Sequence, residues 1–178
     1  MNPLTQFKIF KKILILPHLI ALALVVEHAP AAHAADLAAT PVIDWSNEAR
    51  YAIVPAGPGG IFGTENYGNK FPGEAAVYMG IVHVAIYDAA VAIEGGYEPY
   101  AITLHAPPNT SSAAAIATAT HNTLVGPPGT GTGLQPALGL TNDQVTDLDR
   151  RYYDYLAAIP DGTAKTNGIT VGGRWPRP

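Results

Sequence analysis

Apolar side chains recur at helical intervals along much of the chain. In the first such stretch they stand three or four residues apart and share one helical face: Trp45, Ala49, Ala52 and Ile53. The pattern predicts four helices and a further short one, at about residues 41–54, 74–94, 112–125, 141–159 and 161–171. The sequence therefore predicts a helical protein.

The ends of these helices carry recognisable signals. Residues 55–73 hold six glycines and three prolines, which no regular element tolerates. Gly95 and Gly96 end the second helix, and the hydroxyl residues at 110–112 cap the third. Thr141 and Gln144 form a predicted capping box. Pro160 ends that helix, and Asp161 is the expected cap of the short last one.

The fourth helix is amphipathic. Its apolar stripe consists of Val145, Leu148, Tyr152, Tyr155, Leu156 and Ile159. Two opposite-charge pairs four residues apart, Asp147–Arg151 and Arg150–Asp154, suit its solvated face.

The second helix is apolar almost all round, since Val84 and Val91 stand opposite its main apolar face. Such a helix is expected in the middle of a bundle. Its polar strip consists of His83, Tyr87 and Glu94.

A buried histidine that bonds a neighbouring group is the expected role of His83, because no nucleophile or metal partner stands at a defined spacing. Asp88 lies on another face and is expected to accept hydrogen bonds within the protein. His105 in a loop and His121 in the third helix do not complete a metal-ligand spacing with His83.

The segment GPPGTGTG, Gly126 to Gly133, resembles a phosphate-binding loop in its glycine spacing. Thr132 replaces the lysine of that motif, and Gly133 replaces the hydroxyl residue that holds magnesium. The segment also follows a helix, whereas a phosphate loop follows a strand. We therefore expect a helix–helix connector and no nucleotide binding.

The first 34 residues have the pattern of an export signal. Lysines precede a 14-residue apolar run, and Ala32-His33-Ala34 is a small-x-small cleavage site. Cleavage would leave Ala35 as the mature N-terminus and a periplasmic or extracellular protein without a stable membrane span. An uncleaved anchor is the alternative.

Composition excludes several function classes. The mature chain would carry seven basic and 13 acidic residues, a net charge of about −6, which argues against nucleic-acid binding. The chain has no cysteine, so disulfides, thiol nucleophiles and cysteine zinc sites are excluded.

The stretch VHVAIYDAAVAIEGGYEPY, residues 82–100, resembles the N-terminal half of exported bacterial vanadium-dependent haloperoxidase-like proteins. These proteins belong to the superfamily of type 2 phosphatidic acid phosphatases. Similar segments follow in the same order, VIDW at 42–45, HAPPNTSSAAAIATATHNTLVG at 105–126 and LDRRYYDYLAAIPDGTAKTNGITVG at 148–172. The resemblance implies an all-α fold of two helical bundles, of which residues 35–172 would form the first.

The resemblance also implies a chemistry that this chain does not carry. In the family, K-x-x-x-x-x-x-R-P, P-S-G-H and a final S-R with a later His hold vanadate or phosphate, and peroxide on vanadate oxidises halide. The arginine of the first motif should stand seven residues after the lysine, but here Val77 occupies that position after Lys70, and Gly172 occupies it after Lys165. We therefore assign no catalytic, cofactor-binding or metal-ligating residue and expect this chain to bind no cofactor itself.

Three hypotheses are consistent with the sequence. In the first, the chain is a truncated haloperoxidase-like protein that ends in an aberrant Pro/Arg tail, residues 173–178, and is inactive alone. Its second helix and the Tyr152/Tyr155/Leu156 stripe would lack part of their expected cover, so that it self-associates or needs a C-terminal bundle. In the second, it is a small exported helical interaction module. The third, a phosphatase-like enzyme that uses His83, lacks a complete catalytic set.

Overall fold

The computed structural model describes residues 31–56 and 66–175, with side chains from Thr40 onward. By internal contacts the chain divides into two units, Met1–Ala35 and Asp36–Pro178, and the second holds the buried core. The described residues form no strand, only an isolated bridge between Pro55 and Tyr67. The helices are α1 (Ala31–Ile53), α2 (Pro72–Glu94), α3 (Ser112–Val125), α4 (Gln135–Leu138), α5 (Asn142–Ala158) and α6 (Thr163–Gly172). The predicted all-α fold is confirmed.

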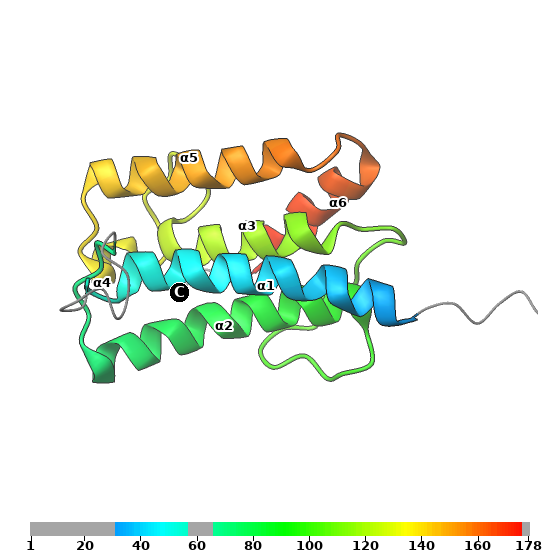
Figure 1. Ribbon diagram of the computed structural model, residues 1–178, viewed down its shortest axis with the longest axis horizontal. Coiled ribbons are helices and arrows are strands. Elements are labelled where there is room, and N and C mark those ends of the chain that lie inside the picture. The colour runs from blue at the N-terminus through cyan, green and yellow to red at the C-terminus, as the bar shows by residue number, and fades with distance from the viewer. Residues whose placement is uncertain (1–30, 57–65, 176–178) are drawn as a thin grey trace, which may run out of the picture. The chain divides into compact units, whose positions relative to one another are not determined.

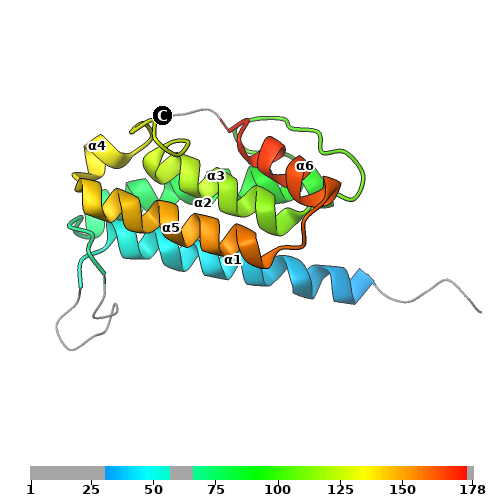
Figure 2. The same ribbon diagram turned by 90° about the horizontal axis from the view of Figure 1, so that it is seen from above.

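The central helix is α3, and α2, α5 and α6 pack against it (Figure 1 and Figure 2). Every residue from Ala114 to Val125 is buried. Alanines and threonines dominate this stretch, and their small side chains let three helices approach one axis closely. The sequence-based expectation that the second helix occupies the middle is wrong. The expectation considered only the apolar character of the helix, whereas α2 buries one face only.

Helix α6 contacts α3 through two glycines one turn apart. A Cβ atom at Gly168 would lie 2.5 Å from the carbonyl oxygen of Ser111, and one at Gly172 would lie 2.8 Å from the Cβ of Thr118. The two backbones therefore approach more closely than any side chain at these positions would allow.

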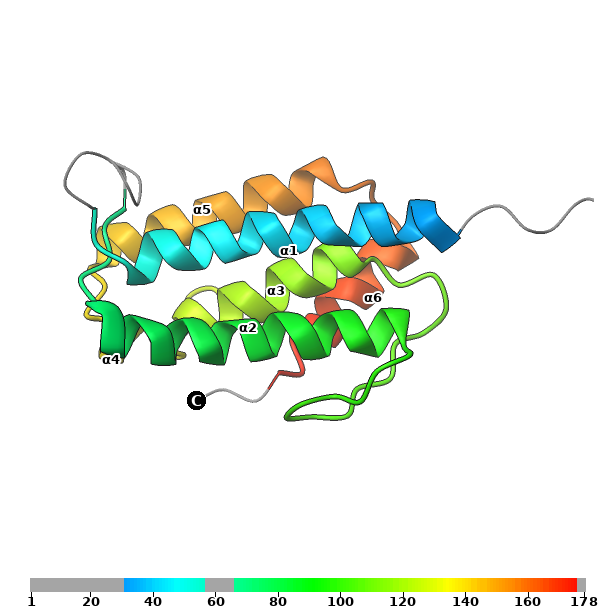
Figure 3. The same cartoon turned by 60° about the horizontal axis from the view of Figure 1, so that its bottom comes forward.

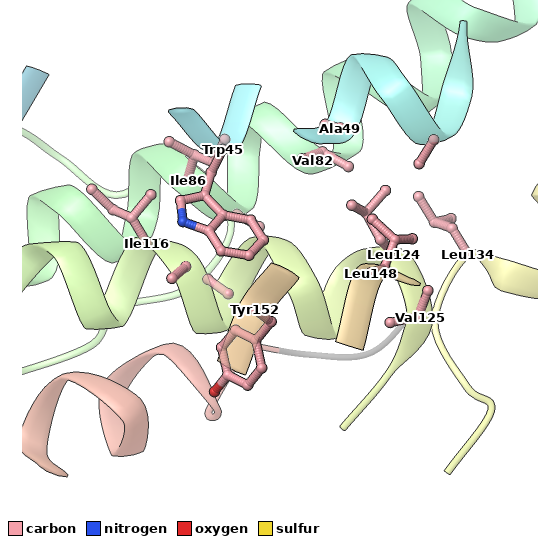
Figure 4. Close-up of a cluster of buried hydrophobic side chains, with 14 of the residues drawn as sticks. Trp45, Ala49, Val82, Ile86, Ile116, Leu124, Val125, Leu134, Leu148 and Tyr152 are labelled. Carbon is pink, nitrogen blue, oxygen red and sulfur yellow. The ribbon is translucent and has the colours of Figure 1, made fainter. Parts of the chain in front are cut away.

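Helix α1 contributes the largest side chain of the core. Trp45 is buried and meets the rings of Tyr152 and Tyr155 of α5 edge to face, with centroids 6.1 and 5.4 Å away (Figure 4). The predicted apolar stripe of α5 is confirmed, since Leu148, Tyr152 and Leu156 are buried. The expectation that this stripe lacks part of its cover is wrong, because Trp45 packs on Tyr152 and Tyr155, and Leu156 is buried as well.

The observed helix ends can be compared with the capping residues that the sequence predicts. The Ser111 side chain accepts a hydrogen bond from the amide of Ala114, and the capping box of Thr141 and Gln144 is present in both directions. Asp161 is not a cap: α6 begins after Gly162, and Asp161 instead pairs with Lys165 at 2.9 Å. Helix α1 also begins ten residues before the predicted start and includes Pro41.

Candidate functional site

The polar strip of α2 serves to hold neighbouring segments. His83 is exposed, so the expected buried environment is wrong, although it does bond neighbours as expected. Its Nδ1 lies 2.9 Å from the carbonyl oxygen of Met79, which can only accept. Nδ1–H is therefore the donor, and Nε2 accepts from the Ser46 hydroxyl of α1 at 3.1 Å.

The Ser46–His83 pair has one element of a nucleophilic site, a hydroxyl hydrogen-bonded to an imidazole whose other nitrogen is oriented. No sequence signal indicates the pair, because the two residues are 37 positions apart. Ser46 lies inside α1, whose backbone amides are engaged in the helix and cannot bind an oxyanion. The pair therefore connects α1 to α2 and does not form a complete catalytic site.

Tyr87 and Asp88 hold the segment that follows α2. The Tyr87 hydroxyl donates to the carbonyl oxygen of Glu98 at 2.9 Å. The buried Asp88 carboxylate accepts from three successive backbone amides, those of Tyr100, Ala101 and Ile102, at 2.6, 2.8 and 2.8 Å. Asp88 is thus an internal hydrogen-bond acceptor, as predicted. Glu94, the third member of the strip, is exposed.

The buried histidine of the structure is His121 of α3. Its Nε2 lies 2.8 Å from Asp149 Oδ1, and its ring stacks on Tyr152 with centroids 4.3 Å apart. Burial lowers the pKa of His121, although its hydrogen bonds to the side-chain oxygens of Asn122 and Asp149 act to raise that pKa. The imidazole is therefore neutral at pH 7 and cross-links α3 to α5. In the sequence, His121 is an isolated histidine in an apolar helix, and this pattern does not identify Asp149 as its partner.

A second charged cluster joins α1 to α5. Arg151 of α5 bonds Asp147 through Nε at 2.7 Å and lies 3.5 Å from Glu48 of α1. Burial raises the pKa of Glu48 although Arg151 opposes it. Burial would also raise the pKa of Asp147, but hydrogen bonds from Arg151 and Arg150 outweigh it and lower that pKa. The predicted Asp147–Arg151 and Arg150–Asp154 pairs are both present.

The glycine-rich segment Gly126–Gly133 connects α3 to the short α4, as expected for a connector. The Gly126 amide donates to Asn122, and the amides of Thr130 and Leu134 donate to Pro127 and Thr123. These amides are engaged within the protein, whereas a phosphate cradle presents its amides outward.

Figure 3 shows α3 on one side of α2. The opposite side of α2 carries exposed or half-buried apolar side chains and glycines. We call it the outer face of α2 and define it by Gly73, Val77, Gly80, Val84 and Tyr87. Val77 is 61% exposed, and no atom lies within 4 Å of a Cβ built at Gly80. Among the described residues α2 is also the one helix long and apolar enough to cross a membrane, judged by length and composition alone.

The described residues do not fit vanadate, the cofactor that the resemblance implies. An oxyanion of that charge needs several converging cations beside a histidine. Here Lys70, Arg150, Arg151 and Lys165 each pair with a carboxylate, and Arg174, which lines a pocket with His105, is a single cation rather than one of several. His121 likewise lies beside Asp149 rather than beside a cation. Within the described ranges there is also no group of three or more His, Asp or Glu that could hold a metal ion.

No family model, no curated protein and no solved structure matches the chain. Any assignment therefore depends on the residues and their geometry.

Proposed function

We propose that the chain is the N-terminal scaffold half of an exported haloperoxidase-like protein, and that it supports the family's peroxide-dependent halide oxidation without performing it. One observation carries the proposal. Tyr87 and Asp88 belong to the first part of the motif that resembles the family, and both hold its end. Tyr87 donates to the Glu98 carbonyl, and Asp88 accepts from the amide of Tyr100 and from those of Ala101 and Ile102 just beyond it. These two polar residues of the motif therefore stabilise the fold.

The outer face of α2 supports the same proposal. A second helical domain would bury Val77, Val84 and Tyr87, and Gly73 and Gly80 would let its backbone approach closely. At about 25 cal/mol per Å², each such apolar side chain contributes roughly 1.5–3 kcal/mol when fully buried. We propose that the C-terminal domain, which would carry the vanadate-binding residues, occupies this face.

The decisive experiment is translation of the DNA beyond codon 172 in all three frames. We expect K-x-x-x-x-x-x-R-P, then P-S-G-H, then S-R with a later His. Their absence from every frame would contradict the assignment to this family. As a biochemical counterpart, the purified chain with vanadate, bromide and peroxide should not brominate a phenol dye. Bromination that His83→Ala abolishes would place an active site in this chain.

A second candidate function is an independent exported helical module that acts by binding. One observation favours it: residues 173–175, which follow α6, belong to the fold, because Trp175 packs against the core and its amide lies 3.4 Å from the Gly172 carbonyl. Sedimentation and urea unfolding distinguish the two. A cooperatively folding monomer favours the module. Association that Val77→Lys abolishes, and that Tyr153→Lys on α5 does not, favours a scaffold whose outer face lacks its partner.

A further inference from the structure

A cavity of about 360 Å³ lies between α6 and the segment that precedes α3. Helix α6 contributes Asn167, Thr170, Val171 and, just beyond its end, Arg174; the preceding segment contributes His105, Ala106 and Pro107. The volume lies at the lower end of the range for small-molecule sites, roughly 300–1,000 Å³. The cavity is separate from the outer face of α2 and from the Ser46–His83 pair, since it shares no residue with either.

Three of the four polar side chains around the cavity, those of Arg174, Asn167 and His105, have no partner among the described residues. Among the described residues, Arg174 is the one basic side chain for which no ion pair, hydrogen bond or ring contact is found. The side chains of Asn167 and His105 likewise have no hydrogen bond within the described chain. Thr170 differs, since its hydroxyl already donates to the carbonyl oxygen of Thr166 at 2.9 Å.

None of the described residues that line this cavity is acidic, although the protein as a whole is acidic. The final carbonyls of α6 accept from the amides of Gly173, Arg174 and Trp175. The C-terminal end of a helix disfavours anions, so the guanidinium of Arg174 is the one charged group among the described lining residues that would attract an anion. Ala106, Pro107 and Val171 supply an apolar wall beside it.

Both walls are fixed before any ligand binds. Gly168 and Gly172 hold α6 against α3. On the opposite wall, the Ala106 amide bonds the Ala92 carbonyl at 3.3 Å, and the Thr110 hydroxyl bonds the Pro107 carbonyl at 2.6 Å. Such preorganisation reduces the entropic cost of binding.

We propose that this cavity binds a small organic anion, with its carboxylate on Arg174 and Asn167 and its apolar body against Val171 and Pro107. A carboxylate accepts two parallel N–H bonds from a guanidinium, which a neutral amide cannot do. The inference does not depend on the proposed function, since it concerns a different surface.

The test is a two-dimensional NMR titration of the full chain with benzoate and, as a neutral analogue, benzamide. We expect saturable benzoate shifts in residues 105–107 and 167–174, with an affinity on the order of 1 mM. Arg174→Gln should weaken binding about tenfold or more, whereas Arg150→Gln, the same change on exposed α5, should leave it unchanged. Absence of saturation, equal binding of benzamide, or equal binding by Arg174→Gln would each overturn the proposal. Unfolding curves that match the curve of the unmodified chain confirm that both variants fold.

Discussion

Replacement of Gly172 by alanine tests whether close approach of α6 and α3 stabilises the fold. The new methyl carbon would lie 2.8 Å from the Thr118 Cβ and 2.9 Å from the Ala119 amide nitrogen, and closer still to the Ala115 carbonyl oxygen. Two of these three atoms belong to the α3 backbone and cannot rotate away. Helix α6 must therefore shift outward along its whole contact with α3.

The expected magnitude follows from two opposing effects. Overpacking of a core costs roughly 1–3 kcal/mol, and the upper end applies where backbone atoms block relaxation. Alanine in place of glycine inside a helix contributes up to about 1 kcal/mol in the other direction. We therefore expect Gly172→Ala to lower the free energy of unfolding by about 2 kcal/mol.

Gly80→Ala is the matched control, because Gly80 also lies inside a helix but has no atom within 4 Å of its built Cβ. It should raise the free energy of unfolding by about 0.5–1 kcal/mol. Urea unfolding followed by circular dichroism measures both variants. If Gly172→Ala were as stable as the unmodified chain while Gly80→Ala gained stability, the close contact of α6 with α3 would be refuted.

Three further outcomes are expected. Asp88→Ala should lower the free energy of unfolding by about 3 kcal/mol or more, because three backbone amides lose their acceptor; unchanged urea midpoints would contradict this. His121 has a folded-state pKa below its ordinary 6.5, so the unfolded chain binds its proton first as the pH falls. The free energy of unfolding should therefore decrease as the pH is lowered from about 7 through 6.5. In urea titrations at successive pH values, His121→Gln should show a weaker dependence of that free energy on pH. Thr141→Ala should cost about 1 kcal/mol by removing the acceptor of the Gln144 amide, and Thr141→Ser, which keeps the hydroxyl, should restore most of it.

Local signals in the sequence predicted local structure well. The capping box at Thr141, the hydroxyl cap at Ser111 and the apolar stripe of α5 depend on residues within a few helical turns of each other. Their geometry follows from the helix itself, so the sequence determines it directly. The failure of Asp161 as a cap has a local cause too: Gly162, at φ 147°, starts the helix one residue later.

The order of the helices in space was not predictable in the same way. Helices α2 and α3 are both apolar, and hydropathy ranks α2 as the more apolar of the two. Side-chain size decides the arrangement instead. Alanine and threonine from Ala114 to Val125 let α3 contact three helices, whereas α2 buries only the face that holds Val82, Ala85, Ile86 and Ala89.

Pairs distant in sequence were also beyond prediction. His121 with Asp149 and Ser46 with His83 are separated by 28 and 37 residues, and no spacing rule links such positions. Asp88 was assigned correctly as an internal acceptor, but its partners could not be named. They are loop amides, which have no side-chain signature in the sequence.

Some of the described polar groups bind within the protein, and others have no partner there. The second kind is the one available to bind a ligand or another protein. Asp88, His121, Asp149 and Arg151 bind within the protein, so changing them should alter stability first. Val77 on the outer face of α2 and the side chain of Arg174 contribute little to the fold, since both are exposed and Arg174 has no partner among the described residues. Val77→Lys and Arg174→Gln should therefore leave unfolding curves nearly unchanged while each removes a different association. Because the two surfaces are separate, either proposal can fail without affecting the other.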